Sequence, residues 1–402
     1  MDVQARLSVL RERLKLAGVV ISFLATVPFM RMVAWSKRKP ENPWVISGHR
    51  GRIYADNAAA VHKELVRQGQ PVIWISDNDE VTAELRAKGQ AVLKRNSFEA
   101  RWAMLTALVL IYSHGESDID LLQILLRYAL GLRIHLNHCM NHVKAGDYHS
   151  PVYQKLWGPR KWFYQLLVTD FDYCLASSES ERENFKLAYP KRAFNIRLGG
   201  GAHLDAFIHG VNEGKRTNDI VYFPTFRDDA SGRRALEGVI EELLNSERLQ
   251  AWLEEKDLRL KIGAHINTGS YSVEGKGRIE WLPPSGIVEA MCTTRGFISD
   301  YSGLIVDALV LKVPVMFFPF DLDEYLQTRW LFHPYEKLAY GPTVRTAEEL
   351  IELLVSGRWE DMAPYAERRR AFREEVIPDL EPTYAQRSVQ TIRDILEEGK
   401  GW

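Results

Sequence analysis

The sequence predicts an α/β protein built from two doubly wound domains, each with a parallel sheet. Short apolar runs alternate with helical segments along most of the 402 residues. The runs are apolar throughout, which is typical of parallel strands covered by helices on both faces. The alternation is interrupted by a polar stretch at 208–218 and then resumes, and a chain of this length can form two cores. We therefore expect two domains facing a cleft, with ligands at the carboxyl ends of the strands.

The first series of elements is expected to form an N-terminal domain over residues 44–210. Apolar runs predict its strands, and segments with helical periodicity between them predict its helices. The expected strands are 44–48, 71–76, 91–94, 107–112, 172–178 and 194–199, and the expected helices are 58–68, 80–88 and 98–106.

The second series is expected to form a C-terminal domain over residues 218–376, with the stretch 208–218 as the interdomain linker. Its strands are predicted at 219–224, 258–264, 278–283, 296–299 and 314–318, and its helices at 234–253 and 347–354. Residues 377–402 follow with a helical pattern. We expect this last helix to pack back on the N-terminal domain.

Composition excludes several classes of protein. A formal net charge of -1 gives no overall attraction to nucleic acid. The three cysteines lack CxxC spacing, which suits a reducing compartment and argues against structural zinc. No GxGxxG, P-loop, HExxH or GxSxG motif is present. We expect neither a metal nor a cofactor, and the sequence does not indicate an oligomeric state.

Residues 1–36 stand apart because an apolar run at 16–30 lies between basic clusters. The run is shorter than the roughly 20 apolar residues of a spanning helix and contains Pro28. A helix lying in the membrane interface, with lysines and arginines on anionic headgroups, is our interpretation. The alternatives are a helix packed on the protein's own core, a true span and a signal peptide.

The motif "SDYSG" (299–303) places a surplus of polar side chains between a buried strand and a helix. Ser302 and the amides of Ser302 and Gly303 are phosphate-binding candidates at the helix start, with Ser299 beside them. Asp300 would repel phosphate, so we expect it to orient a neighbour or hold a sugar hydroxyl. A simple helix cap is the alternative, although it explains only one of these residues.

A second motif, "FPTFRDD" (223–229), also follows a predicted strand. Arg227 offers a planar fork that suits phosphate oxygens, and Thr225 adds a hydroxyl. The alternative is a surface salt bridge from Arg227 to Asp228 or Asp229.

Three histidines, His135, His138 and His142, and Lys144 lie within the short stretch "HLNHCMNHVKAGD". Their spacing matches no metal signature, whereas a neutral imidazole can take a proton from an alcohol. The alternative is that they are ordinary core or surface residues. Upstream, the basic loop "SGHRGRIYADN" (47–57) contains Gly48 and Gly51, which allow a ligand to approach the backbone.

These motifs together resemble the CDP-glycerol glycerophosphotransferase family, the teichoic-acid primases and polymerases with GT-B architecture. "GRIYADNAAAVHKEL" is similar to its opening segment, and "NHCMNHVKAG" to its His-Gly-x-Pro-x-Lys loop. "FPTFRD" resembles its Pro-Thr-x-Arg motif, and "ISDYSGLIVDALVLKVPVMFFPFDLDEY" its Ser-Asp-Tyr-Ser-Ser signature. "YGPTVRTAEEL" resembles its late Gly-Pro turn. The resemblance spans about residues 45–355.

The resemblance implies transfer of glycerol phosphate from CDP-glycerol to a hydroxyl of a lipid-linked glycan or polyol-phosphate acceptor, with release of CMP. It implies an acceptor site on the N-terminal domain and a nucleotide site on the C-terminal domain. The enzyme would act peripherally at the cytoplasmic face of the membrane, in synthesis of a cell-envelope polymer such as teichoic acid or capsule.

The family's motifs also imply roles for individual residues. His138 is the expected base, with His135 and His142 as the other candidates, while Arg227 and Ser302 would hold the pyrophosphate. Downstream positions of the motifs match Asp307 and Asp321, and His265 matches a Lys-x-His-Pro element.

The chain departs from the family pattern in three places. The histidine loop lacks its Gly and Pro, Gly303 replaces the second serine, and Asp205 is the remnant of a Pro-Arg-x-Asp segment. These departures leave CDP-ribitol or another CDP-polyol open as donor. A nucleotide-sugar glycosyltransferase and a catalytically inactive membrane scaffold are the alternative functions.

Overall fold

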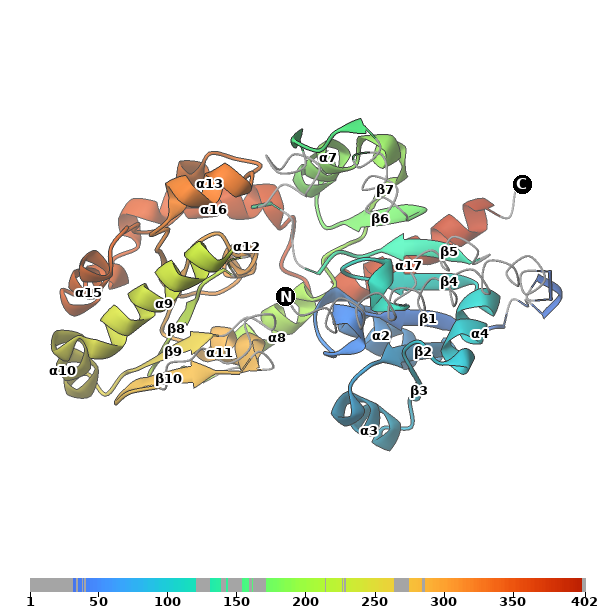
Figure 1. Cartoon of the computed structure of the whole chain (residues 1–402), viewed down its shortest axis with the longest axis horizontal. Helices are drawn as coiled ribbons and strands as arrows, with labels where there is room; N and C mark the ends of the chain where they lie inside the picture. Colours follow the sequence, from blue (N-terminus) through green and yellow to red (C-terminus); the bar gives the residue numbers. More distant parts are fainter. Residues whose placement is uncertain are drawn as a thin grey trace, which may run out of the picture.

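The computed structural model describes residues 32–399 apart from 34, 38, 40, 121–130, 139–141, 144–153, 159–160, 162–170, 214, 226, 228, 264–274 and 284–285. The described residues form two α/β domains that lie side by side (Figure 1).

The N-terminal domain contains a seven-stranded sheet in the order β3-β2-β1-β4-β5-β6-β7, with every neighbouring pair parallel. Its strands are β1 (Trp44–Ser47), β2 (Val72–Ser76), β3 (Ala91–Lys94), β4 (Val109–Tyr112), β5 (Leu132–His135), β6 (Tyr173–Ala176) and β7 (Ile196–Leu198). Its helical segments are η1 (His49–Gly51), α2 (Asp56–Arg67), α3 (Asp79–Ala87), α4 (Phe98–Thr106), η2 (Glu116–Asp118), α7 (Glu179–Ala188) and η5 (Pro190–Asn195). Buried apolar residues pack on both faces of the sheet, so the strands are apolar without alternation.

The C-terminal domain contains a five-stranded parallel sheet in the order β10-β9-β8-β11-β12. Its strands are β8 (Asp219–Phe223), β9 (Arg259–Gly263), β10 (Ile279–Leu282), β11 (Gly296–Ser299) and β12 (Val315–Phe317). Its helices are α9 (Ala230–Asn245), α10 (Glu247–Glu255), α11 (Ile287–Thr293), α12 (Leu304–Asp307), α13 (Leu322–Thr328), α14 (Tyr335–Leu338), α15 (Ala347–Val355) and α16 (Ala366–Val376), with η8 (Arg358–Glu360) and η9 (Ala363–Tyr365).

The predicted class, α/β with two parallel sheets, is confirmed, whereas one helix prediction is wrong and part of the expected linker is helical. The helix expected over 234–253 is two helices, because Ser246 ends α9 and caps α10 by accepting a hydrogen bond from the amide of Leu249. The stretch 208–218, expected to be the interdomain linker, begins inside a helix. Helix α8 (Leu204–Glu213) continues through its first half, because Phe207 and Ile208 pack against Cys292 and Met291 of α11.

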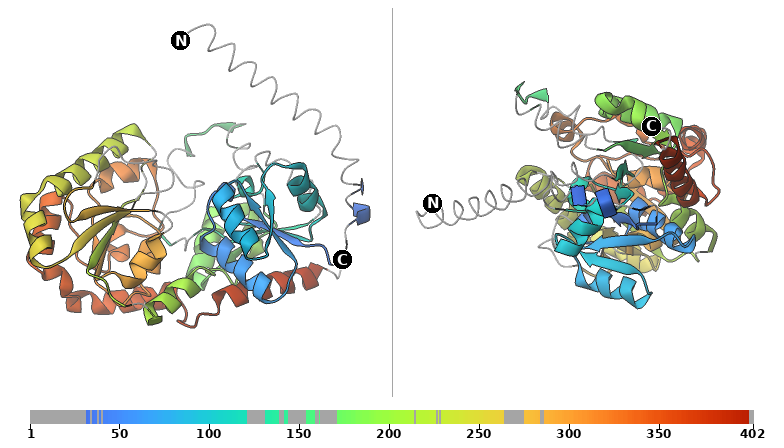
Figure 2. Two further views of the ribbon diagram at one scale, coloured as in Figure 1. Left: turned by 90° about the horizontal axis from the view of Figure 1, so that it is seen from below. Right: turned by 90° about the vertical axis from the view of Figure 1, so that its right-hand side faces the viewer.

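The last helix, α17 (Tyr384–Glu398), packs on the N-terminal domain although the preceding helix belongs to the C-terminal one. Val389 and Ile392 of α17 share a core with Val61 and Leu65 of α2. Figure 2 shows the chain crossing back along one side of both domains before it ends beside the N-terminal sheet.

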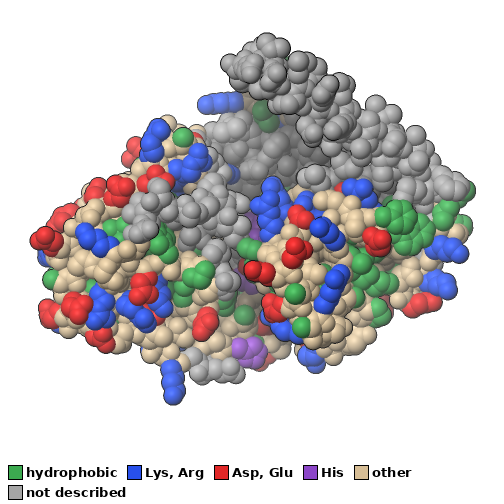
Figure 3. Space-filling model, turned by 60° about the horizontal axis from the view of Figure 1, so that its bottom comes forward, with side chains coloured by type: hydrophobic (Ala, Val, Ile, Leu, Met, Phe, Trp, Pro, Cys, Tyr) green, Lys and Arg blue, Asp and Glu red, His purple; other side chains and the backbone are tan. Residues whose placement is uncertain are grey.

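The surface of the described residues shows no segregation of charge on the face drawn in Figure 3, where acidic and basic side chains intermingle over both domains. This distribution agrees with the net charge of -1. Within the described part of the chain, no helix is both long enough and apolar enough to cross a membrane. Nearly all of the expected membrane-associating segment, residues 1–36, lies outside the described residues.

Candidate functional site

The carboxyl ends of strands from both sheets lie where the two domains meet. On the N-terminal side, loops follow β1, β4, β5 and β7, and on the C-terminal side they follow β8 and β11. His203, after β7, contacts Asp307 at the end of α12 through Nε2 and Oδ1, 2.9 Å apart. The amide of Phe332 also donates to the carbonyl of Val143 across the same boundary, at 3.1 Å. This is the location that open α/β sheets use for ligands.

Arg227 is buried at this location and is bound by two carboxylates. Its Nε and one terminal nitrogen donate to the two oxygens of Asp321, each at 2.7 Å, and the same terminal nitrogen donates to Asp300 at 2.9 Å. The guanidinium also lies over the rings of Tyr301 and Tyr325. Burial alone would lower the pKa of Arg227, but Asp300 and Asp321 reverse this effect and raise it.

The alternative, a surface salt bridge from Arg227 to Asp228 or Asp229, is wrong for Asp229, which caps α9 by accepting from the amide of Gly232. Asp228 lies outside the described residues. The binding of phosphate by Arg227 stays a prediction. Most of its described donors already serve the carboxylates and the Thr225 carbonyl, so the structure assigns it first to the framework of the site.

Asp300 organises the SDYSG turn from a completely buried position. Its carboxylate accepts from the amide of Thr225, at 2.9 and 3.1 Å, in addition to Arg227. Ser299 is equally buried and donates to the carbonyl of Phe223, at 2.6 Å. These bonds join the loop after β8 to the loop after β11 and fix their relative positions.

Ser302, which is buried, and Gly303, which is partly buried, follow Asp300 in this turn. The Oγ of Ser302 accepts from the amide of Leu304 at 3.3 Å, although the residue at the N-cap of α12 is Gly303, so the simple helix cap that we considered as the alternative is not found. Among the described residues, the amides of Ser302 and Gly303 have no acceptor, so both remain available to an anion. Phosphate binding here stays a prediction.

Asp307 joins the two domains through His203. Its second carboxylate oxygen is buried and has no hydrogen-bond donor among the described residues. His203 is held from its other side by Asn57, whose Oδ1 accepts from the amide and from Nδ1 of His203, at 2.9 and 2.7 Å. Burial would lower the pKa of His203, and the Asp307 carboxylate outweighs this and raises it.

Two of the three histidines proposed as base are buried. His135 lies in β5, with Nε2 3.1 Å from the carbonyl of Ser113 and its ring stacked on Phe171, and burial lowers its pKa to about 4. Burial and the nearby charges of His333 and Lys337 lower the pKa of His142 to about 3. Neither position offers an imidazole to a substrate hydroxyl.

His138 is exposed and follows β5 at the carboxyl edge of the sheet. Its ring stacks on His114, with centroids 4.3 Å apart, and it is close enough to Asp56 to influence the pKa of that carboxyl group. Of the three candidates, His138 is therefore the one that a substrate can reach. Lys144 and His265 lie outside the described residues.

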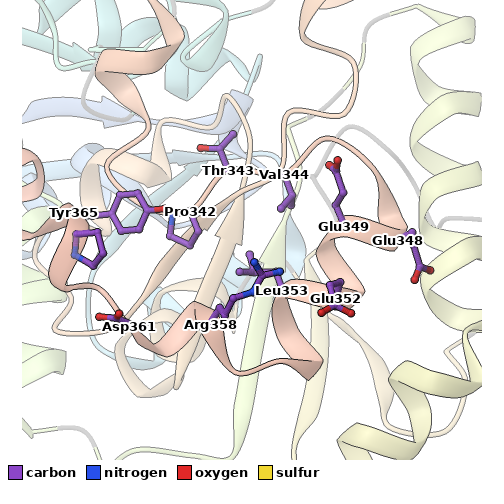
Figure 4. Close-up of a pocket in the computed structure, with 11 residues that line it drawn as sticks. Pro342, Thr343, Val344, Glu348, Glu349, Glu352, Leu353, Arg358, Asp361 and Tyr365 are labelled. Carbon is purple, nitrogen blue, oxygen red and sulfur yellow. The ribbon is translucent and has the colours of Figure 1, made fainter.

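A cavity of about 680 Å³ lies elsewhere, on the outer side of the C-terminal domain. Figure 4 shows its wall, formed by Pro342, Thr343 and Val344, by α15 and by the segment 358–365. Two of its acidic residues, Glu348 and Glu352, pair with Arg248. None of the predicted site residues is among those that line it, so we place the functional site at the domain boundary.

The model of the family described as CDP-glycerol:poly(glycerophosphate) glycerophosphotransferase matches residues 29–393. The chain belongs to this family. It is thus a transferase, as its sequence motifs predicted.

Curated relatives of this glycerophosphotransferase family member act in teichoic acid synthesis by name. The teichoic acid ribitol-phosphate primase of Bacillus spizizenii is 22% identical over 62% of this chain and 66% of its own. The teichoic acid ribitol-phosphate polymerase TarL of Staphylococcus aureus is 27% identical over 37% of this chain. The matches span 66% and 26% of the length of these two relatives.

Solved structures confirm the GT-B-like fold of this family member. The wall teichoic acid polymerase TagF superposes with a TM-score of 0.67 at 18% identity, covering 97% of this chain and 99% of that one. A histidine-to-asparagine variant of TagF has been soaked with CDPG. MnaA of S. aureus, solved with UDP, has a TM-score of 0.54 at 14% identity over 88% of this chain and 96% of its own.

The candidate site contains three residues that the sequence motifs did not single out: Asp56, Asn57 and His203. Asp56 and Asn57 belong to the segment that resembles the family's opening segment. His203 lies two residues before Asp205, the remnant of the family's Pro-Arg-x-Asp segment. A signal was present, since each follows or faces the end of a predicted strand. Only the three-dimensional structure shows that they converge from opposite ends of the N-terminal domain.

Proposed function

We propose that this enzyme transfers a polyol phosphate from a CDP-polyol, CDP-glycerol or CDP-ribitol, to a hydroxyl of a lipid-linked cell-envelope acceptor, releasing CMP. One observation carries the proposal. His138 of the N-terminal domain is exposed, and the amides of Ser302 and Gly303 in the C-terminal domain have no acceptor among the described residues. Both follow strands of two sheets that are joined by the His203–Asp307 contact. The names of the curated relatives support both polyols.

The proposed reaction needs a base on one side and charge stabilisation on the other. The acceptor oxygen attacks the phosphorus that carries the polyol and forms a new P–O bond, while its proton passes to His138. The bond from that phosphorus to the bridging oxygen breaks, and CMP leaves with the electron pair. The amides of Ser302 and Gly303 would stabilise the charge on the diphosphate, because fixed donors need no reorganisation during the reaction.

The donor is tested by measuring CMP or UMP release from CDP-glycerol, CDP-ribitol and UDP-N-acetylglucosamine, with a lipid-linked glycan as acceptor. We expect turnover with a CDP-polyol and none with the UDP-sugar. His138→Ala should lower kcat by about 10²- to 10⁴-fold, the usual contribution of a general base. His209→Ala, at an exposed histidine of α8, is the matched control and should behave as wild type.

The possible outcomes separate the alternatives. A preference for the UDP-sugar would show that the donor is not a CDP-polyol. An unchanged kcat in the His138 variant would show that His138 is not the base. Absence of turnover with every donor would favour an inactive scaffold.

We also propose that residues 1–36 attach the enzyme to the cytoplasmic face of the membrane. Support comes from the apolar run at 16–30 between basic clusters, and a lipid-linked acceptor would be reached from that surface. Deletion of residues 1–36 should move the protein from sedimented vesicles containing anionic lipid to the supernatant. Equal sedimentation of the full-length and shortened proteins would refute the proposal.

A further inference from the structure

A group of metal-ligating side chains lies in the N-terminal domain, at the ends of β1 and β4. His49, Asp56 and His114 each place one ligand atom within 4.8 Å of the others. A zinc-type ion bound at about 2.1 Å requires its ligand atoms to be no more than about 4.2 Å apart. Small side-chain rotations therefore suffice to bring all three onto one ion.

The backbone that carries these ligands is tightly constrained. His49 and Asp56 have φ angles of 50° and 58°, in a region that residues with a Cβ atom seldom occupy. Gly48 fits against Ser113, because a Cβ at Gly48 would lie 2.8 Å from the Ser113 Oγ. The loop after β1 is thus pressed onto the loop after β4, and this contact holds His49 beside His114, with ring centroids 4.1 Å apart.

A second carboxylate, that of Asp118, holds the backbone of the two loops that carry His49 and His114. Asp118 is buried and accepts from the amides of Ser113, His114 and Arg50, at 3.1, 2.8 and 2.8 Å. Its Oδ2 lies 3.8 Å from Nδ1 of His114. At that distance Asp118 fixes the backbone around His114 and does not hydrogen-bond to the ring, whose Nδ1 lies 3.0 Å from the Ser113 Oγ.

The ligand types select the class of ion. Two imidazoles and one carboxylate suit Zn²⁺, Co²⁺ and similar transition metals, whereas Mg²⁺ and Ca²⁺ favour sites made of oxygen ligands. Two of these side chains also contact each other directly, since Nε2 of His49 forms a hydrogen bond with the Asp56 carboxylate.

We propose that His49, Asp56 and His114 form a binding site for a divalent transition metal. No sequence motif indicates this site, because its ligands are separated by up to 65 positions and match no spacing signature. The proposal rests on ligand geometry and does not require the proposed transfer reaction. Because the ring of His114 also stacks on that of His138, a bound ion would lie next to the expected base.

The test measures metal binding directly, on the full chain expressed without a polyhistidine tag and stripped with a chelator. Titration with Co²⁺, followed by visible absorption and by calorimetry, and competition with Zn²⁺ report the site. We expect one equivalent of ion that His114→Ala and His49→Ala each weaken at least tenfold. His209→Ala controls for the removal of an exposed histidine, and Mg²⁺ should not compete.

His114 is exposed, so its alanine variant should fold, and circular dichroism verifies this. Wild-type affinity in both the His49 and His114 variants would overturn the proposal, as would absence of any bound Co²⁺ or Zn²⁺. Activity is not the readout, so an inactive preparation with one bound ion would contradict the transfer function and leave the metal site in place.

Discussion

At the scale of single residues, Arg227 forms a buried ion pair with two carboxylates. The sequence places an arginine after a strand, which suits phosphate binding. In the structure two carboxylates from distant loops, Asp300 and Asp321, converge on it in a buried position. Sequence separation of 73 and 94 positions hides such pairing, because no local pattern connects the three residues.

We predict that Arg227→Ala lowers the free energy of unfolding by about 3–5 kcal/mol. The substitution leaves two buried carboxylates without their cation, and breaking a buried ion pair from one side has a cost of that size. Urea-induced unfolding followed by tryptophan fluorescence measures the change.

Arg234→Ala is the matched control, because Arg234 is an exposed arginine on the neighbouring helix α9 and should change stability by less than about 0.5 kcal/mol. If both variants unfold at the same urea concentration as wild type, the buried network does not stabilise the domain. Loss of turnover with unchanged stability would assign Arg227 to the substrate instead.

At the scale of secondary structure, continuous apolar runs predicted both sheets well. The strands expected at 296–299 and 91–94 match β11 and β3 residue for residue, and the other predicted strands are one or two residues too long at their ends. These runs are informative because parallel strands buried on both faces must be apolar throughout.

The strand β5 was missed because it is not a continuous apolar run. Its sequence, Leu132–His135, carries an arginine and a histidine, which hide the apolar pattern. Arg133 is stabilised by Asp172 at 2.8 Å, and His135 by the Ser113 carbonyl. Asp172 and Ser113 lie in loops next to other strands, so the local sequence around β5 does not show these contacts. The sequence pattern therefore placed His135 in a catalytic cluster, whereas it is a residue of the sheet.

At the scale of the whole molecule, the His203–Asp307 contact between the domains depends on one protonated imidazole. Asn57 donates through Nδ2 to the carbonyls of Leu136 and Asn137, so its Oδ1 must act as an acceptor. His203 therefore donates from Nδ1 to Asn57, and from Nε2 to the Asp307 carboxylate. A ring that donates from both nitrogens is an imidazolium, in agreement with its raised pKa.

The sign of the pH dependence follows from that raised pKa. The charged groups that raise it are Asp307, Asp56 and Glu181. An unfolded histidine titrates near 6.5, so the stabilisation is complete below that pH and is lost as the pH rises through the higher folded value. Glutamine in place of His203 retains a donor but cannot carry the charge.

We predict that His203→Gln lowers the melting temperature most at pH 6 and progressively less as the pH is raised towards 9. At low pH the variant loses a charge-assisted hydrogen bond to Asp307, about 1.5–3 kcal/mol, whereas at high pH the wild type has already lost the same charge. Thermal unfolding of both proteins across this range gives the difference at each pH, with His209→Gln as an exposed control. A difference that stays constant with pH would show that the neutral ring joins the domains equally well, and that the domain contact does not depend on protonation.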